Sequence, residues 1–178
     1  MENVRKWFTE NHITEVECLI PDITGNARGK IIPANKYLKE GGMRLPESIF
    51  YQTVTGEWPD EGEEHFDWTE KDMNLEPDTE SVRFVPWAKE PTAQLIHDCY
   101  DREGNLVDIA PRSVFKRVLA LYEKEGWKPI VAPELEFFLV KKNLDWDYPL
   151  EPPIGRNGRP ETARQSFSID AVNEFDPV

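Results

Sequence analysis

The 178-residue sequence has little cysteine, little basic charge and no long apolar run. Cys18 and Cys99 are too few for a disulfide framework, so we expect two buried free thiols and a reducing, cytoplasmic setting. No stretch approaches the roughly 18 consecutive apolar residues that a membrane-spanning helix needs, and the first residues show no apolar signal core. These absences predict a soluble protein with no membrane partner.

Basic residues are also scarce relative to acidic ones. The chain has 21 Lys and Arg against 34 Asp and Glu, for a formal net charge of -13. A phosphate backbone or an anionic membrane requires a basic surface, so neither is an expected partner. A nucleotide substrate stays possible, because a divalent cation can bridge carboxylates to phosphates. Eleven acidic residues lie between Glu57 and Glu80, and we interpret most of them as a solvated loop.

Aromatic residues are plentiful: six Trp and nine Phe accompany 39% hydrophobic residues, which is enough for a core. The apolar periodicity predicts a short helix over 2–11, a hairpin over 14–32 and a second short helix over 34–40. Residues 43–80 show no regular pattern. Further strands are expected at 81–85 and 92–100, which completes a small α+β unit.

The pattern changes after residue 105. Asp108 is a candidate helix cap, Pro111 suits a first turn, and Gly126 suits the end of the same helix. Its apolar stripe consists of Val114, Val118, Leu121 and Tyr122. Strands are expected at 130–140 and 165–170. The predicted organisation is an N-terminal helix over 1–13, a first domain over 14–105 and the beginning of a second over 106–178.

Residues 131–140 (VAPELEFFLV) carry the most informative pattern. Side chains alternate along a strand, so Glu134 and Glu136 share one face. Carboxylates two residues apart stand roughly 7 Å apart and repel each other. Mg²⁺ or Mn²⁺ would relieve this repulsion and could bridge to ATP phosphates. The spacing alone nevertheless favours an edge strand with a wet polar face over a metal site.

Residues 133–139 (PELEFFL) are similar to the Glu-X-Glu-Phe-Phe-Leu strand of the glutamine synthetase family. Residues 24–33 (TGNARGKIIP) resemble the hairpin of that family's N-terminal β-grasp domain, and residues 101–112 resemble its linker into the catalytic domain. The resemblance implies an α+β fold: a β-grasp domain followed by the truncated start of the catalytic α/β domain. It also implies that Glu134 and Glu136 bind the catalytic Mg²⁺ or Mn²⁺, with ATP as a substrate.

The family's ammonia-using members carry an Asp-Gly-Ser-Ser motif whose Asp helps to bind ammonium in the neighbouring subunit. The corresponding residues here are 45–48 (LPES), which keep only Ser48. Leu45 cannot hold ammonium but could contact the methylenes of a longer amine. Glu47 could pair with that amine's distal ammonium, although a solvated loop glutamate is the plainer interpretation. This stretch resembles the γ-glutamylpolyamine synthetase branch, so we expect a ligase that joins glutamate to an organic amine or polyamine.

The resemblance further implies ATP, glutamate and an amine as partners, and a homo-oligomeric ring. The family's later metal ligands, ATP contacts and glutamate-binding arginines have no counterpart before Val178, so we expect the 178-residue chain alone to be inactive. Two alternatives stay open: an ammonia-using glutamine synthetase, and a non-catalytic β-grasp assembly or binding module. His12, His65 and His97 match no family ligand and are expected to be surface or strand residues. Arg28 and Lys30 are expected to be hairpin surface charges.

Overall fold

The computed structural model describes residues 1–58, 71–162 and 167–175. The chain forms two compact units, Met1–Pro129 and Ile130–Val178, and each is described by itself. Within the described ranges, no helix is both long enough and apolar enough to cross a bilayer.

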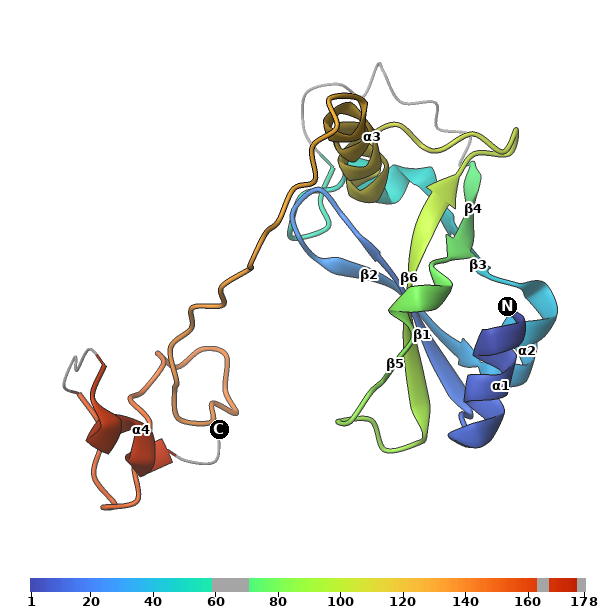
Figure 1. Ribbon diagram of the computed structural model, residues 1–178. Helices are drawn as coiled ribbons and strands as arrows, with labels where there is room; N and C mark the ends of the chain where they lie inside the picture. The colour runs from blue at the N-terminus through green and yellow to red at the C-terminus, as the bar shows by residue number, and fades with distance from the viewer. Residues whose placement is uncertain (59–70, 163–166, 176–178) are drawn as a thin grey trace. The chain divides into compact units, whose positions relative to one another are not determined.

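The first unit is built on a mixed six-stranded sheet (Figure 1). Its path runs β2-β1-β6-β4-β3, and the short β5 also pairs with β6. The β1–β6 pair is parallel, and the other pairs are antiparallel. The strands are β1 (Glu15–Pro21), β2 (Ala27–Pro33), β3 (Met43–Pro46), β4 (Asp72–Pro77), β5 (Arg83–Phe84) and β6 (Thr92–Tyr100).

Two short helices near the N-terminus contribute to the core of this unit. They are α1 (Glu2–Glu10) and α2 (Ala34–Glu40), close to the predicted helices at 2–11 and 34–40. Phe8 of α1 and Tyr37 of α2 have ring centroids 6.0 Å apart, and both side chains are buried. Figure 1 shows the two helices side by side. A mixed α/β architecture therefore underlies the first unit.

The predicted hairpin at 14–32 is confirmed. Val16, Cys18 and Ile20 of β1 are buried and alternate with half-buried residues, as expected for a strand with one face on the core. Both cysteines are free and buried, which also confirms the prediction. Burial raises the pKa of the Cys18 and Cys99 thiols to about 12, so both are protonated, unreactive core groups.

The prediction that residues 43–80 are irregular is wrong for the part of that range that the structure describes. The strands β3 and β4 pair with each other, and the 3₁₀ helices η1 (Glu47–Tyr51) and η3 (Thr79–Ser81) follow them. Residues 59–70 of the acidic stretch lie outside the described residues. The two strands carry only a few core residues each, so the pairing partner, rather than the local pattern, specifies them.

Helix α3 (Pro111–Lys124) begins two residues later than predicted. Its N-cap is Ala110, with Pro111 in the first turn, and Gly126 follows its end with a positive φ of 71°. The capping role predicted for Asp108 is wrong, because the Asp108 carboxylate instead accepts a hydrogen bond from Arg117 at 3.0 Å. The predicted apolar stripe of the helix is between 40% and 58% exposed.

The second unit departs most from the prediction. Residues 130–140 are not a β-strand, and Ile130, Leu135 and Phe138 are at least 90% exposed. A strand is stable only when its backbone pairs with a neighbour, and none of the described residues pairs with this stretch. The strand predicted at 165–170 is also wrong where it is described, since α4 (Ile169–Phe175) begins at Ile169.

Candidate functional site

The two predicted metal ligands, Glu134 and Glu136, lie in the exposed stretch of the second unit. Both carboxylates face solvent, and no described residue forms a hydrogen bond or an ion pair with either. Among the described residues, no three His, Cys, Asp or Glu side chains come together as a metal cluster. The stretch thus presents two hard oxygen donors without a completed coordination shell.

The predicted amine loop divides between the core and the surface. Leu45 lies in β3 and is only 5% exposed, with its side chain in the hydrophobic core of the first unit. Glu47 and Ser48 lie in η1 and are half-buried. The Tyr51 hydroxyl donates to the Glu47 carboxylate at 3.5 Å. Burial, followed by the Glu47 charge, raises the pKa of Tyr51. An amine-binding role for these residues stays a prediction.

A cluster of four charged residues joins α3 to the sheet. Arg112 donates to Asp98 at 3.0 Å and to Asp78 at 2.7 Å, and Lys116 donates to the other Asp98 oxygen. Burial would raise the pKa of Asp98, but its bonds to Lys116 and Arg112 lower it overall. Sequence reasoning missed this cluster because its members lie far apart along the chain. The available signal was Asp98, a charged residue inside the apolar strand β6.

Arg28 is more than a surface charge of the hairpin. Asp22, which is 3% exposed, accepts hydrogen bonds from the backbone of Thr24 and Asn26 and from the Arg28 guanidinium at 2.7 Å. Burial would raise the pKa of Asp22, but the bonds from Arg28, Thr24 and Asn26 lower it to about 2. Asp22 therefore holds the hairpin turn closed as a carboxylate.

His97 is a strand residue, as predicted, but it is fully buried. One ring nitrogen lies 3.1 Å from the Tyr37 hydroxyl, and the other lies 3.1 Å from the Leu95 carbonyl. When Nδ1 carries the ring proton it donates to the Leu95 carbonyl, and Nε2 then accepts a hydrogen bond from the Tyr37 hydroxyl. Burial lowers the pKa of His97, which keeps the ring neutral. His12 is exposed, and His65 lies outside the described residues.

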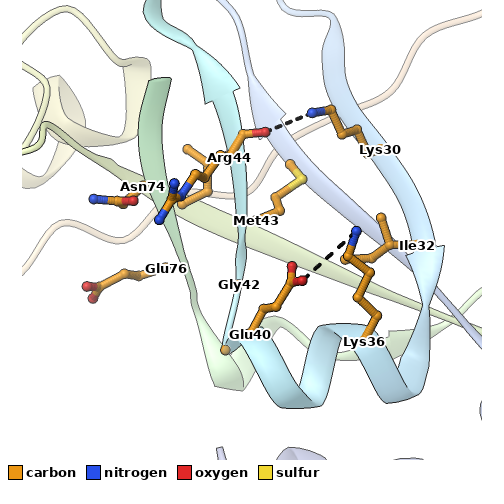
Figure 2. A pocket seen from close by; sticks show the side chains of 11 residues that line it. Lys30, Ile32, Lys36, Glu40, Gly42, Met43, Arg44, Asn74 and Glu76 are labelled. Atoms are coloured by element: carbon orange, nitrogen blue, oxygen red, sulfur yellow. Dashed lines mark hydrogen bonds and ion pairs between the residues drawn. The ribbon is translucent and has the colours of Figure 1, made fainter. Parts of the chain in front are cut away.

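The first unit also contains a groove of about 700 Å³ (Figure 2). It is lined by β2, helix α2, β3 and the neighbouring strand β4, and Ile32 and Met43 supply apolar lining. Lys30 of β2 spans the groove and donates from Nζ to the Arg44 carbonyl of β3 at 3.0 Å. Figure 2 shows the Arg44 guanidinium on the side of Asn74, away from Lys30. Of the three strands that line the groove, β2 and β3 are the two ends of the strand path, and β4 lies inside it.

Comparison with known proteins connects both units to one family. Residues 108–178 match the glutamine synthetase catalytic domain, and this match includes Glu134 and Glu136. The chain is 32% identical over 168 residues to gamma-glutamylputrescine synthetase PuuA of Escherichia coli strain K12, which covers 92% of the chain and 35% of that protein. The chain resembles the glutamine synthetase family over most of its length.

Two further proteins extend the comparison. Glutamate–isopropylamine ligase of a Pseudomonas species is 27% identical over 146 residues, covering 79% of the chain and 31% of that protein. The solved GmaS/ADP complex has a TM-score of 0.57 at 21% identity, covers 70% of this chain and 26% of that one, and supports the fold alone. The chain spans about a third of the length of the curated relatives it matches.

Proposed function

We propose that this chain forms the N-terminal part of an ATP-dependent ligase that joins glutamate to an amine through γ-glutamyl phosphate. The observation that carries the proposal is the Glu134-X-Glu136 pair, which lies inside the segment that matches the glutamine synthetase catalytic domain. In such a reaction ATP phosphorylates the γ-carboxylate of glutamate, and the amine then displaces phosphate from the acyl phosphate. Positioning and electrostatic stabilisation provide most of the catalysis.

Glu134 and Glu136 would hold Mg²⁺ or Mn²⁺ in this enzyme. Carboxylate oxygens are the donors that these ions prefer, so the two residues fit the ion in kind. Their exposure also leaves the carboxylates free of competing partners within the described part of the chain. The bound ion would offset the charge of the transferring phosphoryl group. The described residues supply two donors, so further ligands have to come from elsewhere in the protein.

The amine is proposed to be organic rather than ammonia. Supporting this are Leu45 and Glu47, which replace the Asp and a Ser of the ammonia-binding motif, and similarity to two proteins named for larger amines. Leu45 is in the core, so Glu47 and Ser48 are the members of the loop that are open to solvent. An ammonia-using glutamine synthetase is the second candidate, because several similar proteins carry that name.

The remaining family features belong to the same proposal. A β-grasp domain over 14–105 is supported by the mixed sheet with helices α1 and α2 in its core, and the beginning of the catalytic domain over 106–178 is supported by the matched segment. A homo-oligomeric ring and a cytoplasmic location are proposed from the resemblance to that family. The non-catalytic assembly module stays the alternative from a different class.

The test is an assay of ATP turnover with the longest protein that the gene encodes. Glutamate is held constant, and ammonia is compared with a diamine, isopropylamine and methylamine. We expect amine-dependent ADP release with a higher kcat/KM for an organic amine. Preference for ammonia would refute the organic-amine proposal. A protein that binds Mn²⁺ but never turns over ATP would favour the non-catalytic module.

A further inference from the structure

The sheet of the first unit leaves two of its edges open on either side of one groove. β2 and β3 stand at the two ends of the strand path, and the groove of about 700 Å³ separates them beside α2 (Figure 2). Within the described residues, a single hydrogen bond, from Lys30 Nζ to the Arg44 carbonyl, bridges β2 and β3 directly. Open strand edges pair readily with another extended chain.

The ladder between β1 and β2 shows which backbone groups are available. The Ala34 N–H donates to the Thr14 carbonyl at 2.9 Å, so these two facing residues form a hydrogen-bonded pair. Every second pair along the ladder is then hydrogen-bonded in the same way. In an antiparallel pair every second residue directs its N–H and C=O away from the partner strand. In β2 these residues are Gly29 and Ile31, so their backbone groups form the open edge.

The same alternation identifies the backbone groups on the open edge of β3. The Glu47 N–H donates to the Lys71 carbonyl at 3.0 Å at the end of the β3–β4 ladder, and the alternation then directs the Arg44 backbone away from β4. The Arg44 carbonyl is the group that Lys30 reaches. Lys30 thus occupies the position that a further strand would take between β2 and β3.

The charge of the groove is opposite to that of the chain. Its lining includes three basic residues, Lys30, Lys36 and Arg44, and two acidic residues, Glu40 and Glu76. The whole chain, by contrast, carries a formal charge of -13. The ion pair between Lys36 and Glu40 is long, at 4.0 Å, and more than half exposed, so Lys36 can exchange this partner for another. An acidic ligand is therefore the one that complements this surface.

We propose that the groove binds an extended acidic segment of a partner protein as an added strand on the open edge of β2. The segment would be about five residues long, given the rise of about 3.3 Å per residue along a strand. Its backbone would pair with Gly29 and Ile31, and its aliphatic side chains would lie over Ile32. Its carboxylates would meet Lys36 and Lys30, with Lys30 exchanging the Arg44 carbonyl for a carboxylate.

The probe is a capped peptide Asp-Val-Ile-Val-Glu-Glu, titrated into the 178-residue chain and followed by calorimetry and by amide NMR. Two control peptides accompany it: one with Lys at every acidic position, and one with alternate backbone nitrogens methylated to block strand pairing. We expect binding of the acidic peptide, with the Gly29 and Ile31 amides shifted and protected from exchange. Both control peptides should fail to bind.

Two substitutions separate charge from strand pairing. K36E should weaken binding about three- to tenfold, because it reverses an exposed charge pair. The matched control is K39E on the same helix, since Lys39 does not line the groove. I31P removes an outward N–H without touching the β1 ladder and should weaken binding about tenfold. Circular dichroism establishes that each variant is folded.

Three outcomes would overturn the proposal. One is equal binding of the acidic and the methylated peptides, which would exclude strand addition. Another is equal loss with K36E and K39E, which would reduce the effect to overall charge. The third is a concentration-dependent dimer that I31P dissociates in the absence of peptide, which would assign the edge to a second copy of the chain.

Discussion

Asp22 and His97 are both nearly inaccessible to solvent, yet they keep opposite charge states. Burial opposes charge on either group. At Asp22 the hydrogen bonds from Arg28, Thr24 and Asn26 outweigh burial, so the carboxylate stays ionised. At His97 the effect of burial on the pKa prevails, and the neutral ring hydrogen-bonds with the Tyr37 hydroxyl and the Leu95 carbonyl. The stability of the first unit should therefore depend on pH through both groups, in a different pH range for each.

The substitution D22N should destabilise the hairpin by about 1–3 kcal/mol at neutral pH, because Arg28 and two backbone donors lose an ionised acceptor. The pKa of Asp22 is lowered from 3.8 to about 2 on folding, so its contribution is present above pH 3.8 and is lost as pH falls toward 2. When unfolding is measured by urea denaturation over this pH range, the free energy of unfolding of D22N should fall less with decreasing pH than that of the wild type. D72N, at an exposed strand position, is the control and should retain the wild-type dependence.

The folded pKa of His97 lies below its ordinary value of 6.5, so the unfolded chain takes up a proton at a higher pH than the folded chain. Stability should be complete above pH 6.5 and should fall as the pH drops below that value. H97Q should flatten this part of the profile at a cost of about 1–3 kcal/mol. The measurement is chemical denaturation on both sides of pH 6.5. The control H12N should keep the slope, and a slope that survives H97Q would contradict the assignment.

At the scale of elements, the attachment of α3 depends on Arg112. R112A should cost about 1–3 kcal/mol, because Asp98 and Asp78 lose a shared partner and Asp98 is only partly solvated. R117A is a matched control on the same helix, since the Arg117–Asp108 pair has side chains 51% and 89% exposed and should contribute about 0–1 kcal/mol. Amide exchange across α3 and urea denaturation measure the difference. Equal effects of the two variants would refute the role of Arg112.

The elements that the sequence predicted are those with local signals. The hairpin has a turn between two alternating segments, and α2 lies between Pro33 and the αL glycine Gly41. By contrast, β3 pairs with residues about 30 positions away, so its place depends on the closure of the chain. The stretch 130–140 has a strand pattern without a partner among the described residues. The alternation of apolar residues shows which face of a segment could be buried. The segment becomes a strand only when its backbone pairs with a neighbouring strand.

The candidate site divides in the same way. The metal-binding role of the Glu134-X-Glu136 pair stays a prediction that rests on a short motif, since the spacing of the two residues alone favoured a solvated strand. The Asp98 cluster and the groove were not predictable, because each joins segments that are adjacent only after the sheet has formed.

At the scale of the molecule, the chain covers about a third of the length of its relatives, and the proposed metal site includes two of its carboxylates, Glu134 and Glu136. Two monodentate donors without substrate phosphates hold Mg²⁺ or Mn²⁺ weakly, with a dissociation constant on the order of millimolar or weaker. The 178-residue chain alone should therefore show weak Mn²⁺ binding by paramagnetic resonance. The double variant E134Q/E136Q should weaken it further. The matched variant E123Q/E125Q, which removes two exposed carboxylates at the same spacing, should not.

The same chain should release no ADP in the presence of ATP, glutamate and an amine, because phosphoryl transfer requires a metal ion held in a complete shell together with bound nucleotide. The measurement is a coupled assay at saturating Mg²⁺ over the amines named above. Turnover that depends on the amine and disappears in E134Q/E136Q would contradict this expectation, since it would place a working site within these residues. Turnover that survives in E134Q/E136Q would instead indicate a contaminating ATPase, and it would leave the assignment of the two glutamates intact.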